Sequence, residues 1–83
     1  MSAEKSDASS LWDMLDAARA VESFVAGRSL QTYLGDRLLR GGVERHLEII
    51  GEAARRVSPA FKAVHPEIPW PSIVGLRLVS RAL

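Results

Sequence analysis

Residues 36–57 read DRLLRGGVERHLEIIGEAARRV and carry the clearest structural signal in this chain of 83 residues. At 100° per residue, the apolar side chains of the stretch recur every three or four positions and fall on one narrow stripe. The stripe consists of Leu39, Val43, Leu47, Ile50, Ala54 and Val57. This pattern predicts one long helix, against which the other segments pack.

Both ends of the long helix are marked in the sequence. Asp36 is a suitable N-cap, because its carboxylate can accept a hydrogen bond from a backbone N–H that the helix leaves unpaired. Pro59 pushes the preceding residue, Ser58, out of the helical region, so the helix is expected to end there. Gly41 and Gly42 weaken its first half, at a cost of about 1 kcal/mol each relative to alanine.

The residues before the long helix predict a disordered start and two further helices. Residues 1–8 are polar, and we expect them to be disordered. Ser10 and Asp13 resemble a capping box that opens the first helix. Gly27 suits the position just past its end, and Ser29 can cap a short helical turn.

The residues after the long helix predict a short helix, a rigid connector and a final helix. Ser58 can cap the short helix with a proline at its first position. Three prolines stiffen residues 65–71, and Trp70 is the natural anchor of this connector. The final helix is apolar nearly all round except for Arg77 and Arg81, and it reads as cut short. We expect one helical domain over residues 9–83, incomplete at its C-terminal end.

Composition excludes several kinds of site. The chain has no cysteine, and therefore no disulfide and no thiolate metal site. Its two histidines and scattered carboxylates lack metal-ligand spacing, so we expect neither a metal nor a cofactor. The polar start lacks the apolar region of a signal peptide, and no apolar run is long enough to cross a bilayer. We therefore expect a soluble, cytoplasmic protein that does not bind a membrane.

Charge is unevenly distributed along the chain. Residues 1–26 hold two basic and five acidic side chains, and residues 27–83 hold nine and five, so the net charge changes from −3 to +4. The basic part is either a set of solvated helix faces or a weak footprint for a polyanion such as RNA.

Two features of the long helix have a structural and a functional interpretation. Glu44, Glu48 and Glu52 form a column that is either a solvated face paired with nearby arginines or a docking face for a basic partner. The candidate pairings are Arg40 with Glu44, Arg45 with Glu48, and Arg56 with Glu52. His46 borders the apolar stripe and is either a packed, hydrogen-bonded side chain or a catalytic base.

Three segments together are similar to the HepT-like HEPN proteins in order and spacing. They are LWDMLDAARAVESFVAG from Leu11, LEIIGEAA from Leu47 and PEIPWPSIVGLR from Pro66. The resemblance implies an all-α HEPN-like helical bundle, with its last helix cut short in this chain, that forms a homodimer. It also implies that the chain is the toxin of a type VII toxin–antitoxin system. Such a toxin is a metal-independent RNA endonuclease, and it is encoded beside an MntA-like nucleotidyltransferase antitoxin. That antitoxin silences the toxin by adenylylating a tyrosine.

The family motif Arg-Asn-x-x-x-His-x-Tyr matches this chain at Arg77 alone. The resemblance implies that Arg77 holds phosphate and stabilises the charge developing on it. Leu78 occupies the asparagine position and Ala82 the histidine position, and the tyrosine position falls beyond Leu83. The missing histidine is the group that would exchange a proton near neutral pH.

Three functions follow from this departure. In the first, the chain cleaves RNA through Arg77 with His46 or His65 as a substitute base. In the second, the chain is a remnant without a selected function. The alternative is a non-catalytic helical interaction module, which dimerises or binds a full-length relative or the nucleotidyltransferase. Arg77 and Arg81 lie one turn apart and could still bind RNA weakly.

Overall fold

The computed structural model describes residues 6–79, which form five α-helices and one 3-10 turn and contain no strand. The elements are α1 (Asp7–Val25), α2 (Leu30–Gly35), α3 (Arg37–Arg56), α4 (Pro59–Val64), α5 (Trp70–Gly75) and η1 (Leu76–Leu78). The all-α fold predicted from the periodicity is confirmed.

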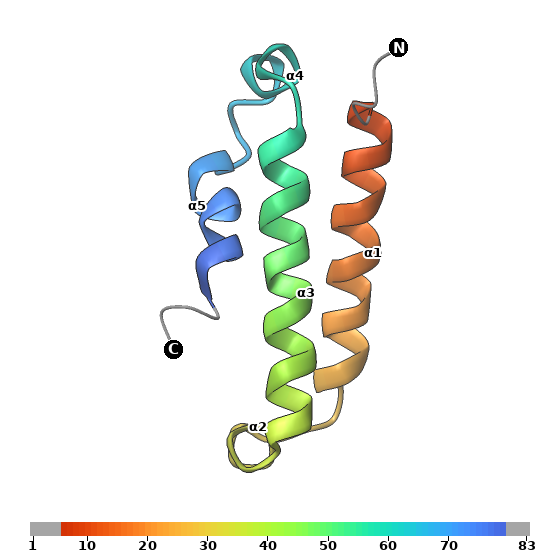
Figure 1. The fold of residues 1–83 in the computed structure, drawn as a ribbon, viewed down its shortest axis with the longest axis vertical. Helices are drawn as coiled ribbons and strands as arrows, with labels where there is room; N and C mark the ends of the chain where they lie inside the picture. Colours follow the sequence, from red (N-terminus) through yellow and green to blue (C-terminus); the bar gives the residue numbers. More distant parts are fainter. Residues whose placement is uncertain (1–5, 80–83) are drawn as a thin grey trace.

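The long helix α3 is the centre of the molecule. Helix α1 runs antiparallel beside it along most of its length, and α5 with η1 lies against α3 on the other side (Figure 1). The short helices α2 and α4 lie at opposite ends of α3 (Figure 1). Helix α3 is therefore packed on two sides, which explains why Gly51 and Ala53 are buried although neither belongs to the predicted stripe.

The predicted boundaries of the middle helices are confirmed by their caps. Asp36 Oδ1 accepts a hydrogen bond from the Leu39 N–H at 3.0 Å, and Ser58 Oγ accepts one from the Phe61 N–H at 3.1 Å. Ser29 caps α2 in the same way. Gly27 has a φ of 71°, the left-handed conformation that favours glycine just past a helix end.

The start of α1 differs from the prediction. Ser6 is the N-cap, because its hydroxyl accepts a hydrogen bond from the Ser9 N–H at 3.1 Å, so Ser10 lies inside the helix and is buried. Asp7 and Ala8 belong to the first turn, which shortens the stretch expected to be disordered; residues 1–5 lie outside the described residues. Helix α1 begins early because its first turn has a partner far away in the sequence.

That partner is Ser58, at the turn between α3 and α4. Asp7 Oδ1 accepts a hydrogen bond from the Ser58 N–H at 2.8 Å, and Asp7 Oδ2 accepts one from the Ser58 hydroxyl at 2.6 Å. These bonds to Ser58, together with the charge of Lys62, hold the pKa of Asp7 below its usual value of 3.8. The ionised form of Asp7 therefore ties the start of α1 to the end of α3.

We expect Asp7→Asn to lower the Tm at neutral pH and to flatten the loss of stability in acid. A carboxylate with a lowered folded-state pKa stabilises the fold above its unfolded pKa, and this contribution is lost as the pH falls below 3.8 toward the folded pKa. Thermal melts from about pH 5 down to about pH 2.5 measure the effect. Asp16→Asn, on the exposed side of the same helix, is the control. Parallel acid profiles for Asp7→Asn and the wild type would contradict the expectation.

The hydrophobic core lies where α1, α3 and the connector meet. Ala54, Val57 and Trp70 are its buried centre, and Leu11, Met14 and Phe61 are among the side chains packed around it. Trp70 is confirmed as the anchor of the connector, since it is 6% exposed and its Nε1–H donates to the His65 carbonyl at 3.0 Å.

The final helix begins inside the stretch of residues 65–71 that was expected to be a rigid connector, and its α-helical part is short. Helix α5 starts at Trp70, with Pro71 in its first turn, and gives way to the 3-10 turn η1 at Leu76. Residues 80–83, which the sequence placed in the same helix, lie outside the described residues.

Candidate functional site

Arg77 lies in η1, where the chain packs against the middle of α3. Its side chain borders a cavity of about 260 Å³, which is lined by Arg45, Glu48, Glu52, Arg77 and Leu78. The structure thus brings the single matching motif residue next to a second arginine and to two members of the glutamate column. Leu78, at the position of the motif asparagine, is 42% exposed at the edge of this cavity.

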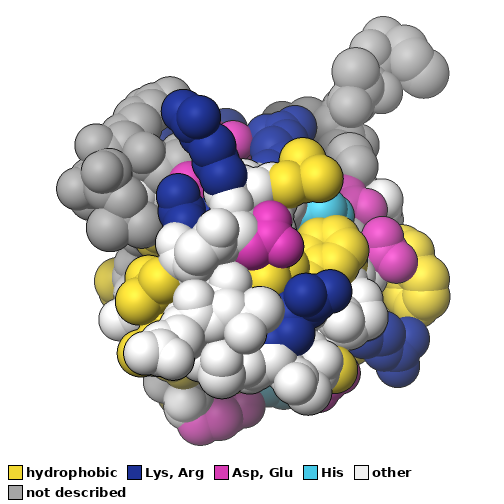
Figure 2. All heavy atoms as spheres, turned by 90° about the horizontal axis from the view of Figure 1, so that it is seen from below, with side chains coloured by type: hydrophobic (Ala, Val, Ile, Leu, Met, Phe, Trp, Pro, Cys, Tyr) yellow, Lys and Arg dark blue, Asp and Glu magenta, His cyan; other side chains and the backbone are white. Residues whose placement is uncertain are grey.

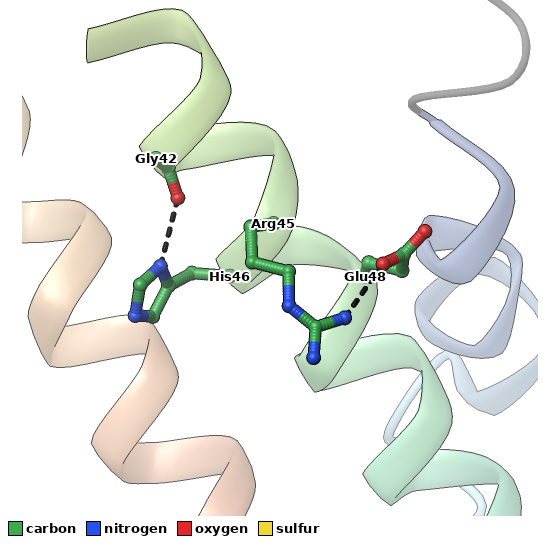
Figure 3. A network of polar contacts seen from close by, with 4 residues as sticks. All are labelled: Gly42, Arg45, His46 and Glu48. Carbon is green, nitrogen blue, oxygen red and sulfur yellow. Dashed lines mark hydrogen bonds and ion pairs between the residues drawn. The ribbon is translucent and has the colours of Figure 1, made fainter. Parts of the chain in front are cut away.

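Charge pairing in the cavity leaves the guanidinium of Arg77 incompletely bonded. Arg45 Nη1 donates to Glu48 Oε1 at 2.8 Å (Figure 3), and the Arg55 Nε–H donates to Glu52 Oε1 at 3.1 Å. The Nε of Arg77 is buried and has no hydrogen-bond partner among residues 6–79. A buried, unpaired donor on a cationic group is costly and favours an anionic acceptor.

The glutamate column is less solvated than the sequence suggested. The Glu48 side chain is 26% exposed, because α5 and η1 pack against this side of α3. The predicted pair of Arg45 with Glu48 is confirmed. The other two pairings are wrong: Glu52 bonds to Arg55 one turn away, and Arg40 donates instead to the Leu34 carbonyl, which closes α2 onto α3.

His46 is a packed side chain on the side of α3 away from Arg77. Its Nδ1–H donates to the Gly42 carbonyl at 2.7 Å, and its ring meets Phe24 of α1 edge to face at a centroid distance of 5.2 Å. Figure 3 shows His46 directed toward α1, and Glu48 on the opposite side of α3. The structural interpretation of His46 is confirmed.

His65 is also occupied by structural contacts. Its ring lies 4.6 Å from the Phe61 ring, its carbonyl accepts from Trp70, and its Nδ1 lies 3.1 Å from Glu67 Oε2. The backbone N–H of Glu67 and then His65 hold the pKa of the Glu67 carboxyl below its usual value. Among the residues described, neither histidine lines the Arg77 cavity. Ala82 and Arg81 lie outside the described residues.

Residues 6–79 contain neither a cluster of metal ligands nor a membrane-spanning helix. Within residues 6–79, no three histidine, cysteine or carboxylate side chains lie close enough together to hold a metal ion. None of the helices described is both long and apolar enough to cross a membrane.

A second hollow lies at the α2 end of the molecule and was missed in the sequence. It has a volume of about 750 Å³ and is lined by Phe24, Arg28, Asp36, Arg37, Leu38, Leu39, Gly41 and Gly42. Figure 2 shows hydrophobic side chains gathered on this end, flanked by basic and acidic ones. We call this surface the α2-end hollow. Leu30, Leu34 and Leu38 at the same end are 72%, 57% and 87% exposed. In the sequence they recur every four residues and lie outside the predicted apolar stripe, which was the available signal for an exposed apolar surface.

Comparison with known proteins identifies the family of this fold. The family model for "Ribonuclease HepT-like" matches residues 14–79, which include α3, the connector and Arg77. The chain belongs to the HepT-like ribonuclease family. The membership predicted from the three sequence segments is therefore confirmed.

Two curated relatives illustrate how much of a HepT-like protein the chain covers. It is 37% identical over 67 residues to "Putative RNase MJ1380" of Methanocaldococcus jannaschii and, over the same length, to "Probable ribonuclease HepT" of Thermococcus cleftensis. Each alignment covers 81% of this chain but 62% and 61% of the relatives, respectively. The chain thus spans less than two thirds of the length of these relatives. No solved structure matches it.

Proposed function

We propose that this chain is a HepT-like domain of a type VII toxin–antitoxin system that binds RNA phosphate through Arg77 and does not cleave RNA. The observation that carries the proposal is the buried, unpaired Nε of Arg77 beside a cavity that also contains Arg45. A phosphodiester oxygen in this cavity can accept from the terminal N–H groups of the Arg77 guanidinium, whose planar shape suits phosphate geometry. RNA is met in the cytoplasm, where we expect this role.

The lack of cleavage follows from what surrounds Arg77. General acid–base catalysis needs a proton-transferring group within hydrogen-bond reach of the reacting oxygen. Leu78 and Ala82 occupy the asparagine and histidine positions of the motif, and neither can exchange a proton. His46 and His65 are held in other contacts, so neither is a substitute base. Arg77 can bind and neutralise a phosphate, but it stays protonated and cannot act as a base.

RNA binding by Arg77 is tested with a labelled single-stranded RNA at low salt. We expect weak binding that Arg77→Ala reduces by about 10- to 150-fold, since a hydrogen bond to a charged group contributes about 1.5–3 kcal/mol. A plot of the logarithm of the binding constant against the logarithm of the salt concentration should also become less steep. Its slope should change by about 0.7, the value for one phosphate contact in a single strand. Arg37→Ala, which removes the same charge at the α2 end, is the control. Equal weakening by both variants would show a diffuse attraction and contradict the proposal.

We also propose that the chain associates, as a homodimer or with a nucleotidyltransferase antitoxin, through the α2-end hollow. The support is the exposure of Leu38 in this hollow, and of Leu34 and Leu30 in two smaller pockets that share Arg37 and Arg28 with it, because exposed apolar patches mark interaction surfaces. This is the non-catalytic interaction module that the sequence left open. The charges that flank the hollow, such as Arg28 and Arg37, would add selectivity.

Association is tested by light scattering of the purified chain at micromolar concentration. We expect a dimer that Leu38→Asp converts to a monomer without loss of helicity, since Leu38 is 87% exposed and has little packing to lose. Trp12→Asp, at an exposed tryptophan on α1, is the control and should leave the dimer intact. A wild-type monomer, or a dimer that survives Leu38→Asp, would contradict this surface.

A further inference from the structure

Gly51 allows the backbone of η1 to touch the backbone of α3. A Cβ placed on Gly51 would lie 2.3 Å from the Arg77 nitrogen, 2.9 Å from the Arg77 Cα and 2.9 Å from the Val74 carbonyl oxygen. Separations this short are far inside van der Waals contact, and all three atoms belong to the backbone, which cannot rotate away. Any side chain at position 51 must therefore displace η1 from α3.

The other glycines of the helices do not have this role. Gly41 and Gly75 have open space where a Cβ would stand, and Gly42 meets only the edge of the Phe24 ring at 3.5 Å. Helix propensity disfavours glycine at all of these positions alike, by about 1 kcal/mol relative to alanine. Gly51 differs because a segment of the chain that carries a candidate functional side chain rests directly on it.

The position of this contact determines what surrounds Arg77. Gly51 follows Glu48 by three residues and Glu52 follows Glu48 by four, so both are neighbours of Glu48 on its face of α3. Because η1 rests on that face, the Arg77 side chain enters the cavity lined by Glu48 and Glu52. The buried Nε of Arg77 follows from the same close approach.

We propose that Gly51 is a positioning residue that sets the location of the Arg77 guanidinium for a phosphate ligand. The inference rests on the proposed function for its ligand, but the geometry that it describes can be measured without RNA. His46 lies five residues from Gly51 and is rotated from it by about 140°, so a change at position 51 does not act through the His46 contact with α1.

The experiment compares Gly51→Ala with Gly75→Ala and Gly41→Ala, which introduce the same methyl group into open space. The first readout is the NMR signal of the Arg77 Nε–H. We expect slow exchange with water in the wild type and both controls, and fast exchange in Gly51→Ala. The second readout is affinity for single-stranded RNA. We expect Gly51→Ala to weaken it about as much as Arg77→Ala, and the double variant to match Arg77→Ala within about twofold, because the two residues act as one unit.

Each outcome is decisive. A folded Gly51→Ala variant that keeps slow Nε–H exchange and wild-type affinity overturns the proposal, as does a Gly51→Ala effect that simply adds to that of Arg77→Ala. If circular dichroism shows an unfolded Gly51→Ala, the measurements are repeated in sucrose, which favours compact states. Failure to fold there as well would make Gly51 a requirement of the whole fold and would also overturn a positioning role. If Arg77→Ala leaves RNA affinity unchanged, the proposed function is wrong. The exchange rate of the Arg77 Nε–H in the wild type and in Gly51→Ala then still shows whether Gly51 positions this side chain.

Discussion

Trp70→Ala is expected to lower the free energy of unfolding by about 3–5 kcal/mol, the cost of truncating a large aromatic side chain in a core. Trp70 is 6% exposed, packs edge to face on Phe61 at 6.1 Å, and donates from Nε1 to the His65 carbonyl. Lys62 Nζ lies 5.7 Å from the centroid of the same ring system. The substitution therefore removes apolar burial and one of the two hydrogen bonds to the His65 carbonyl, which keeps the bond from the Ile68 N–H.

Urea unfolding followed by circular dichroism measures this effect. Trp12→Ala is a matched control, because the same side chain is 57% exposed on α1 and its removal should change stability by no more than about 0.5 kcal/mol. Since a small domain is stable by only about 5–15 kcal/mol, Trp70→Ala is expected to remove a large part of that margin. Similar losses from the two substitutions would show that the connector is not anchored by Trp70.

The local parts of this fold could be predicted because their signals lie within one or two turns of chain. The apolar repeat of α3, the Asp36 and Ser58 caps, and the glycine at the end of α1 each depend on neighbours close in sequence. Trp70 could be predicted as an anchor because a large amphipathic side chain stands among prolines. The family resemblance added Arg77, which periodicity alone would not have distinguished from other arginines.

The contacts that were missed join distant parts of the chain. Asp7 bonds to Ser58 across 51 positions, so no local pattern distinguished it from the polar residues before it. The sequence interpreted the glutamate face of α3 as solvated or as a docking face for a basic partner. Both interpretations left this face uncovered by the chain itself, because the apolar pattern of α3 marks one buried stripe only. Packing α5 and η1 against that face gave Gly51 a role, and the signal available was a glycine placed between Glu48 and Glu52 in an otherwise good helix.

The purified chain is expected to cleave RNA no faster than background. A positioned general acid–base group typically contributes about 10²- to 10⁴-fold to the rate. Among residues 6–79 no histidine lines the cavity beside Arg77, and the two carboxylates that do, Glu48 and Glu52, are paired with arginines. If Arg77 holds phosphate as proposed, binding and cleavage should be separable in this protein. That separation is what distinguishes a non-catalytic member from one that has adopted another base.

A labelled-RNA cleavage assay tests this, with the wild type compared with Arg77→Ala, His46→Ala and His65→Ala and with a commercial ribonuclease as a positive control. No time-dependent product is expected from any of the four chains, even at protein concentrations that saturate RNA binding. Product that disappears in Arg77→Ala and in one histidine variant would identify a base at a spacing foreign to the family motif. His46 would then have to leave its bond to Gly42 and its contact with Phe24, and His65 its contacts with Phe61 and Glu67. Product that is unchanged in all three variants would come from a contaminating nuclease, since no substitution at the candidate site affects it.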